Sequence, residues 1–107
     1  MIFIDIAAAD ELAEGQMKRF EAGGQRLLLC RSNGEHFVIG EMCSHEDYSL
    51  FLGCVRDGRI KCSLHGSWFD LKSGAALDEP AHAPIRVYPV ETASGRLLAG
   101  IRRGFCD

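Results

Sequence analysis

Two short segments of the sequence combine a cysteine with a histidine at spacings that suit metal binding. The first is Cys43-Ser44-His45, and the second, after a gap of 16 residues, is Cys62-Ser63-Leu64-His65. Thiolates and imidazoles are ligands both for zinc and for iron–sulfur clusters. Together the two segments supply two sulfur and two nitrogen ligands, which fits a tetrahedral zinc ion or a mixed-ligand iron–sulfur cluster.

The distribution of the ligands favours the second kind of site. Zinc fingers usually place two cysteines in one segment and two histidines in another. Here each segment carries one ligand of each type, which better suits two irons, one bound by both thiolates and the other by both imidazoles. Gly66, directly after His65, would let the backbone approach such a site closely.

Composition places the chain among ordinary globular proteins. Its 107 residues predict one domain over residues 1–107, and 47% of them are hydrophobic. The net charge of −3 and the absence of a concentrated basic segment argue against binding to nucleic acid or an anionic membrane surface. No segment reads as a signal peptide or membrane span, so we expect a cytoplasmic protein. The odd count of five cysteines favours metal binding over a disulfide framework.

The hydrophobic pattern predicts short strands separated by tight turns. Turn signals occur at Gly23-Gly24, Asn33-Gly34, Asp57-Gly58 and Ser94-Gly95, where positive φ is tolerated. Strands are expected at residues 2–6, 17–22, 26–31, 36–39, 54–55, 59–61, 68–71, 85–90 and 96–101. A helix of about two turns is expected at residues 7–14, and an extended loop at 78–84. The prediction is an all-β fold, a small sandwich or barrel from which the two metal-binding loops project at the same end.

The two segments resemble the motif of Rieske [2Fe–2S] proteins, in which histidines replace cysteines on one iron. Flanking residues that carry the resemblance are Gly58-Arg59-Ile60-Lys61, Gly66-Ser67-Trp68-Phe69-Asp70, Lys72-Ser73-Gly74 and the proline-containing stretch 80–90. The resemblance implies one [2Fe–2S] cluster whose inner iron is bound by Cys43 and Cys62 and whose outer iron is bound by His45 and His65. It also implies a cluster-binding subdomain formed by the two loops.

Three residues around the motif bear on the reduction potential. High-potential relatives have an additional cysteine in each loop, joined in a disulfide, and these positions are Tyr48 and Leu64 here. They also have a serine and a tyrosine that donate hydrogen bonds toward sulfur; Ser67 matches the serine, but Phe69 replaces the tyrosine. Fewer donors stabilise the reduced state less, so a low potential is expected within the Rieske range of roughly −150 to +300 mV.

The resemblance implies an electron carrier and not an enzyme. A chain of 107 residues has no room for the catalytic domain of a terminal oxygenase. It resembles the ferredoxin of a bacterial multicomponent aromatic-ring-hydroxylating dioxygenase, which receives single electrons from a flavoprotein NAD(P)H-dependent reductase and passes them to the terminal Rieske oxygenase. The acidic pair Glu46-Asp47 would place negative charge beside His45 for docking to basic patches on both partners.

Two other functions are also compatible with the sequence. The small subunit of an assimilatory nitrite reductase has a similar fold, but such subunits often lack the four ligands. A structural zinc module would use the same residues without redox activity.

Several other residues are expected to have structural roles. Cys54 is predicted to be a buried thiol rather than a competing ligand, and Cys30 and Cys106 to be structural or incidental. His36 and His82 are expected at the surface. Trp68 suits a core position or a place beside the metal site equally well.

Overall fold

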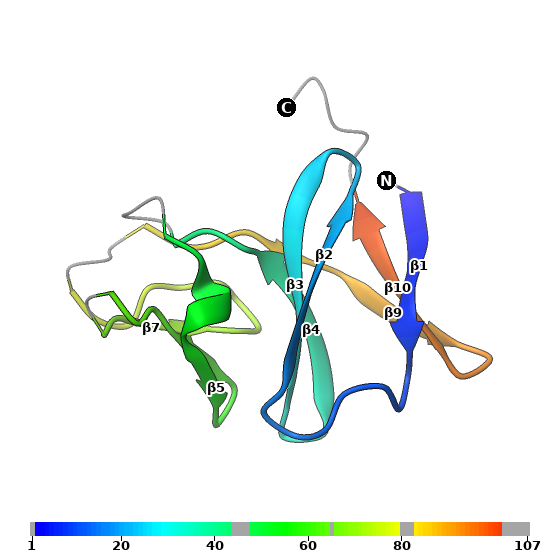
Figure 1. Cartoon of the computed structure of the whole chain (residues 1–107), viewed down its shortest axis with the longest axis horizontal. Coiled ribbons are helices and arrows are strands. Elements are labelled where there is room, and N and C mark those ends of the chain that lie inside the picture. The colour runs from blue at the N-terminus through cyan, green and yellow to red at the C-terminus, as the bar shows by residue number, and fades with distance from the viewer. Residues whose placement is uncertain (1, 44–47, 65, 80–82, 102–107) are drawn as a thin grey trace.

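The computed structural model describes residues 2–43, 48–64, 66–79 and 83–101, which form three antiparallel sheets (Figure 1). The strands are β1 (Ile2–Ala8), β2 (Met17–Ala22), β3 (Gln25–Ser32), β4 (Glu35–Gly40), β5 (Cys54–Arg56), β6 (Arg59–Lys61), β7 (Trp68–Asp70), β8 (Val87–Tyr88), β9 (Val90–Ala93) and β10 (Arg96–Ile101). A short 3₁₀ helix, η1 (Leu50–Leu52), precedes β5. The predicted all-β class is confirmed. The described residues contain no helix with the length and apolar character needed to cross a bilayer.

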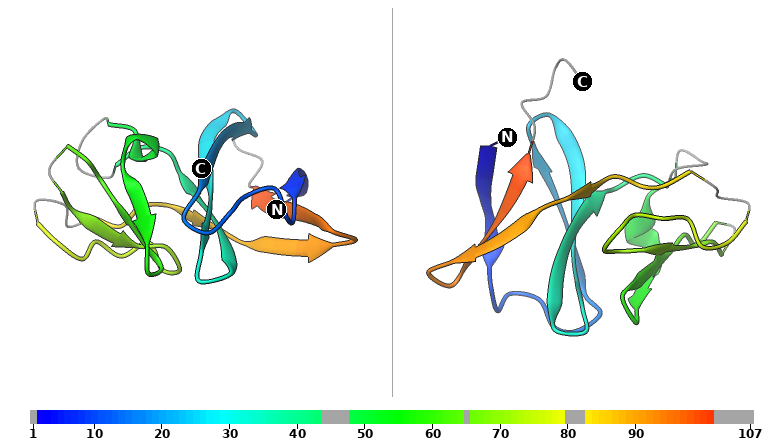
Figure 2. Two further views of the ribbon diagram at one scale, coloured as in Figure 1. Left: turned by 60° about the horizontal axis from the view of Figure 1, so that its bottom comes forward. Right: turned by 180° about the vertical axis from the view of Figure 1, so that it is seen from behind.

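The three sheets lie side by side, with the largest in the middle. This middle sheet has the strand order β2-β3-β4-β8, and it separates the sheet β1-β10-β9 from the small sheet β5-β6-β7 (Figures 1 and 2). In the sequence, the first expected metal loop follows β4 of the middle sheet and precedes η1, and the second lies between β6 and β7 of the small sheet. β1 and β10 bring the two ends of the described chain together.

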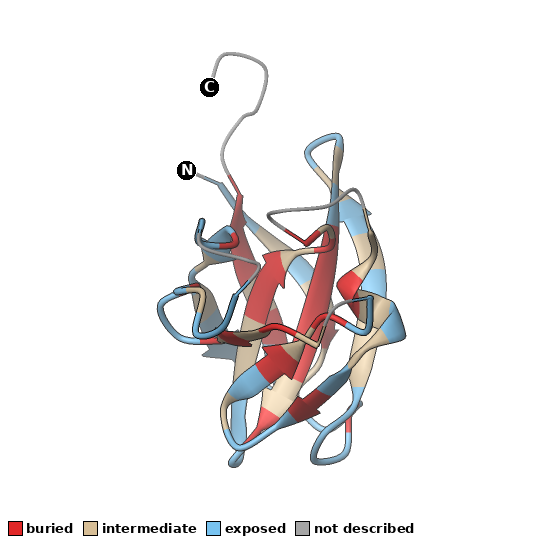
Figure 3. Cartoon of the chain, turned by 90° about the vertical axis from the view of Figure 1, so that its left-hand side faces the viewer, coloured by how far each residue is buried: buried red, intermediate tan, exposed pale blue. Residues whose placement is uncertain are grey.

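The middle sheet is buried on both faces, because its strands supply two separate hydrophobic cores. On β3, Leu27 and Leu29 face a core shared with β1 and β10, which we call the terminal core. Leu28 and Cys30 face the other core, shared with the small sheet, which we call the loop-side core. Figure 3 shows the buried stretches of the strands in red. All four are fully buried. A strand buried on both faces reads as a continuous apolar run instead of an alternating one, which explains the sequence of β3.

The predicted hairpin turns are confirmed. Asn33-Gly34 and Asp57-Gly58 both have positive φ at their two central positions, as does Ser94-Gly95. These turns connect β3 to β4, β5 to β6 and β9 to β10. Two central residues with positive φ match the twist of the adjoining strands, so each turn sets the register of its hairpin.

The helix predicted at residues 7–14 is wrong. β1 continues to Ala8, and the segment that follows forms turns. The carbonyl of Leu12 accepts a 2.7 Å hydrogen bond from the Arg31 guanidinium, and the Gly15 amide donates to the Arg31 carbonyl at 2.8 Å. The side chain of Leu12 is buried in the terminal core. Contacts with β3 therefore satisfy backbone groups that a helix would have satisfied internally, and tertiary packing overrides local propensity.

The single strand predicted at residues 85–90 is divided into two. Pro89 lies between β8 and β9, and these strands belong to different sheets. Proline has no amide hydrogen to donate to a continuing ladder, so the chain leaves the middle sheet at this point and joins the sheet of β1 and β10.

Gly53 permits a very close contact between the two halves of the loop-side region. A Cβ atom at this position would lie 1.7 Å from the carbonyl oxygen of Lys61. Gly53 follows η1 and the first loop, whereas Lys61 directly precedes Cys62. The absence of a side chain at Gly53 therefore allows the backbone of the first loop region to lie against the start of the second.

We expect Gly53→Ala to destabilise the fold by at least about 3 kcal/mol, because backbone atoms must move to admit the methyl group. Gly40→Ala is the matched control, since a Cβ there would meet the Arg86 Cβ at an ordinary 3.7 Å. Chemical denaturation of the two variants measures the difference. Equal free energies of unfolding would contradict the close contact.

Candidate metal centre

The first loop leaves the middle sheet after β4 and begins at Cys43. Its two ends are joined by backbone hydrogen bonds: the Cys43 amide donates to the Tyr48 carbonyl at 2.8 Å, and the Leu50 amide donates to the Glu41 carbonyl at 2.7 Å. Met42 and Ser49 form an isolated β-bridge between these bonds. This closed base fixes the position of Cys43. His45 and the acidic pair Glu46-Asp47 lie outside the described residues.

The second loop has a similar closed base. The Cys62 amide donates to the Ser67 carbonyl at 2.8 Å, and the Gly66 amide donates back to the Cys62 carbonyl at 2.8 Å. Gly66 has a φ of +76°, which a residue with a side chain rarely adopts. The loop is therefore a tight return between β6 and β7. His65 lies outside the described residues.

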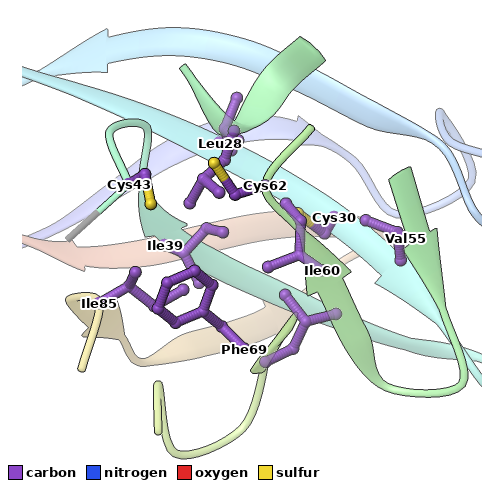
Figure 4. Packing of buried hydrophobic residues seen from close by; sticks show 11 residues of the cluster. Leu28, Cys30, Ile39, Cys43, Val55, Ile60, Cys62, Phe69 and Ile85 are labelled. Atoms are coloured by element: carbon purple, nitrogen blue, oxygen red, sulfur yellow. The ribbon is translucent and has the colours of Figure 1, made fainter. Parts of the chain in front are cut away.

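The two cysteines enter the same apolar environment. Cys43 and Cys62 both belong to the loop-side core, where they lie among Leu28, Ile39 and Ile60 (Figure 4). Both are buried, and neither forms a disulfide. Two buried thiols that share one core at the bases of two loops fit the thiolate half of a Rieske ligand set.

The described part of the chain contains two of the four predicted ligands. No group of three or more histidine, cysteine, aspartate or glutamate side chains that could hold a metal is found within it. Both predicted histidines are among the residues that the structure does not describe, so the assignment of His45 and His65 stays a prediction.

A buried carboxylate that the sequence analysis did not single out supports the first loop. Glu41 is only 3% exposed, and its Oε2 accepts a 2.5 Å hydrogen bond from the Ser49 hydroxyl. Its Oε1 accepts from Arg26 Nε at 3.3 Å, and Arg19 Nη1 lies 3.8 Å from Oε2. Burial by itself would raise the pKa of this carboxyl, but the hydrogen bonds from Ser49 and Arg26 lower the pKa below its usual value. Glu41 thus links the start and end of the loop to β2 and β3.

The free cysteines outside the motif differ sharply in exposure. Cys30 is fully buried in the loop-side core, as expected for a structural residue, and burial raises the pKa of its thiol to about 12. The prediction that Cys54 is buried is wrong, because its side chain is exposed. It lies on the outward face of β5, whereas its neighbour Val55 points into the core. Cys106 lies outside the described residues.

Two further expectations are modified by the structure. His36 is half-buried instead of solvated, and its Nε2 has no hydrogen-bond partner among the described residues. Trp68 is also half-buried, on the outer face of the small sheet and not in the core. His82 lies outside the described residues.

Ser67 and Phe69, the residues expected to affect the potential, are both fully buried. Phe69 belongs to the loop-side core together with Val55 and Ile60, and Figure 4 shows its ring on the side of the core where Ile39 and Ile85 lie. A phenyl ring at this position adds apolar burial worth about 1.5–3 kcal/mol but has no hydroxyl to donate.

Comparison with known proteins gives consistent matches. The model of the Rieske [2Fe-2S] domain matches residues 3–89. The ferredoxin component of biphenyl 2,3-dioxygenase from Rhodococcus jostii (strain RHA1) is 34% identical over 104 residues, which cover 97% of this chain and 97% of that protein. The structure of the ferredoxin of carbazole 1,9a-dioxygenase from Nocardioides aromaticivorans IC177 is similar with a TM-score of 0.87 and 26% identity, covering 94% of this chain and 98% of that chain.

The fold is also similar to that of a Mycobacterium tuberculosis protein assigned as the small subunit of an NADH-dependent nitrite reductase. The TM-score is 0.81 at 22% identity, and the match covers 92% of this chain and 93% of that chain. Similarity at this level of identity concerns the fold alone.

We expect Glu41→Gln to lower the free energy of unfolding by about 1–2 kcal/mol, because it removes the buried negative charge that accepts hydrogen bonds from Ser49 and Arg26. Glu35→Gln, at an exposed position at the start of β4, is the matched control. Denaturation curves compare the variants, and an equal loss in both would mean that Glu41 does not support the loop.

The thiols of Cys54 and Cys30 should differ in their reactivity toward an alkylating reagent. Under native conditions at pH 8, we expect iodoacetamide to alkylate Cys54 and to leave Cys30 unmodified, because alkylation needs an accessible thiolate. Peptide mass spectrometry identifies the modified cysteine, and Cys54→Ser is the control. Alkylation of both thiols at similar rates would contradict the burial of Cys30.

Proposed function

Because this chain belongs to the Rieske [2Fe-2S] domain family, we propose that it is a ferredoxin that carries single electrons between protein partners. The family model covers most of the chain, and the alignment with the biphenyl dioxygenase ferredoxin component spans 97% of both proteins. Such components are electron carriers and not catalysts, so no residue is assigned a catalytic role.

The observation that carries this proposal is the pair of buried cysteines, neither in a disulfide, at the bases of the two loops. We assign Cys43 and Cys62 as ligands of the inner iron, and His45 and His65 as ligands of the outer iron. A [2Fe–2S] cluster held by these residues would supply one-electron redox chemistry. Burial of Cys43 and Cys62 keeps their sulfur atoms away from water, which favours one stable ligand set.

An exposed leucine of the second loop supports contact with a partner protein. Leu64 lies between Cys62 and His65 and is 43% exposed, although it is aliphatic. Electron transfer requires the donor group to be near the surface where the partner docks. An exposed leucine beside the ligands offers apolar area that docking can bury.

A low reduction potential within the family follows from Phe69 and from the loop residues Tyr48 and Leu64. The side chain of Phe69 cannot donate a hydrogen bond to sulfur, and Tyr48 and Leu64 cannot link the loops by a disulfide. Fewer donors leave the additional negative charge of the reduced state less stabilised.

We propose a cytoplasmic role in a bacterial aromatic-ring-hydroxylating dioxygenase system. A flavoprotein NAD(P)H-dependent reductase would reduce this protein, and a terminal Rieske oxygenase would receive the electron. The relatives reported above belong to systems named for biphenyl and carbazole, both aromatic compounds. The nitrite reductase alternative has the fold in its favour, but the complete ligand set in the sequence of this chain argues against it. A purely structural zinc role is disfavoured by the family match.

We expect the purified protein to contain two irons and two acid-labile sulfides per chain, and the reduced form to give the EPR signal of mixed histidine and cysteine ligation.

Replacing His45 or His65 with cysteine should lower the potential or abolish assembly of the cluster, because an added thiolate increases negative charge. Metal analysis, EPR and voltammetry are the measurements.

His36→Asn is the matched control, because His36 lies on β4 outside both loops. It should leave the iron content and the potential unchanged. One zinc per chain without sulfide would exclude the electron-carrier function. An unchanged voltammogram for His45→Cys or His65→Cys would contradict the ligand assignment.

A further inference from the structure

The small sheet has two chemically different faces. Val55, Ile60 and Phe69 are paired across the three strands and point into the loop-side core. Because side chains alternate along a strand, the residues on either side of this row point outward. The outward residues are Cys54, Lys61 and Trp68 in one row and Arg56, Arg59 and Asp70 in the other.

Three cations on this outward face surround one indole ring. Arg56, Arg59 and Lys61 place their charged ends 5.7, 5.2 and 5.8 Å from the centre of the Trp68 ring. We call these four residues the basic face. Arg56 and Arg59 are exposed, and Lys61 and Trp68 are half-buried.

The charges of the basic face are not neutralised within the part of the chain that the structure describes. The salt bridges found there involve Lys18, Arg19, Arg26 and Arg96, and none involves a cation of the basic face. Asp70 is opposite Arg59 in the register, but its carboxylate accepts hydrogen bonds from the amide and hydroxyl of Ser73, both at 2.8 Å.

Packing of the Trp68 indole does not require three neighbouring cations. One cation over an exposed ring is worth about 0.5–1 kcal/mol, whereas neighbouring like charges repel each other. Gathering three cations in a chain of net charge −3 therefore points to an anionic group that the face receives from elsewhere.

The position of the basic face connects it with the metal loops. Lys61 directly precedes Cys62, and Trp68 follows the closing residues of the second loop. Lys61 and Trp68 are also paired in the register, so residues of this face end β6 and begin β7, the two strands that hold the second loop. A macromolecule bound here would lie beside the second loop.

We propose that the basic face is a docking surface for an acidic patch on a protein electron-transfer partner. The proposal rests on the proposed function for the nature of the partner, and on charge complementarity for its chemistry. Guanidinium groups bind carboxylates in a bidentate manner, and the contact with Trp68 restricts Arg56 and Arg59 before the partner arrives. Opposite charge also accelerates encounter and orients the second loop toward the partner.

The basic face has the opposite sign to the acidic pair Glu46-Asp47 of the first loop. The acidic pair by itself predicts docking through negative charge only. The structure adds a positive surface, formed by three strands, on the side of the second loop.

The first test monitors binding of a peptide to the basic face through the fluorescence of Trp68, the single tryptophan of the chain. Octaglutamate is titrated into the holoprotein at low ionic strength while tryptophan emission is followed, and octalysine and a neutral Gly-Ser peptide serve as comparison probes. We expect a saturable change with octaglutamate alone, weakened about tenfold in Arg56→Gln/Arg59→Gln and abolished by added salt.

Arg96→Gln is the matched control, because Arg96 is an exposed arginine paired with Asp5 on the sheet of β1 and β10. It should bind octaglutamate as the wild type does. No change in emission with octaglutamate, or equal weakening by Arg96→Gln, would overturn the proposal. Tighter binding of a DNA oligonucleotide of equal charge would also overturn it, in favour of a nucleic-acid ligand.

The second test measures electron exchange with the reductase and the terminal oxygenase as a function of salt. For at least one partner, Arg56→Glu/Arg59→Glu should slow the second-order rate at low salt by about tenfold, with rates converging at high salt. Iron content and potential should stay unchanged, which separates docking from damage to the cluster. Unchanged rates with both partners would overturn the docking role, whereas absence of an iron–sulfur cluster would instead refute the proposed function.

Discussion

The structure depends on the burial of one strand, β3, on both of its faces. Its leucines alternate between the terminal core and the loop-side core, so the middle sheet is common to both. The small sheet has strands of only three residues each, and sheets of this size are marginal alone. It is stable because Val55, Ile60 and Phe69 pack against residues of β3 and β4 such as Leu28 and Ile39. The site therefore depends on a core that most of the chain helps to build.

Within that arrangement, the two loops are positioned by different means. The first is joined at its base by hydrogen bonds and attached to β2 and β3 through Glu41. The second is a tight return between β6 and β7 that requires the positive φ of Gly66. Gly53 lets the two regions lie in contact. Cys43 and Cys62 thus reach one apolar environment from different sheets.

Charge is distributed around the two cysteines in a way that suits recognition by a protein. The core behind the loops is apolar, the outward face of the small sheet is cationic, and the sequence of the first loop is acidic. An electron carrier must dock, exchange an electron and leave. Exposed charges suit this cycle because they accelerate encounter while contributing modest affinity.

Much of the fold and of the candidate site could be predicted from local sequence. Turn chemistry at Asn33-Gly34 and Asp57-Gly58 specifies the hairpins, and the spacing of Cys43, His45, Cys62 and His65 indicates the metal chemistry, because both depend on residues close together in the chain. Tertiary contacts decided the rest. The segment before Gly15 has helical propensity, yet Arg31 of β3 satisfies its backbone groups in an irregular path.

Burial likewise depends on what lies beyond each strand face, which no local pattern contains. Cys30 and Cys54 both lie on strands, but Cys30 faces the small sheet and Cys54 faces outward. For the same reason the basic face was not predicted from the sequence. Arg56, Arg59, Lys61 and Trp68 lie on three different strands, and the register of these strands brings them to one face. The sequence by itself determined the turns and predicted the set of metal ligands. Only the tertiary structure decided which side chains are enclosed and which charges are gathered, because both are properties of strands packed together.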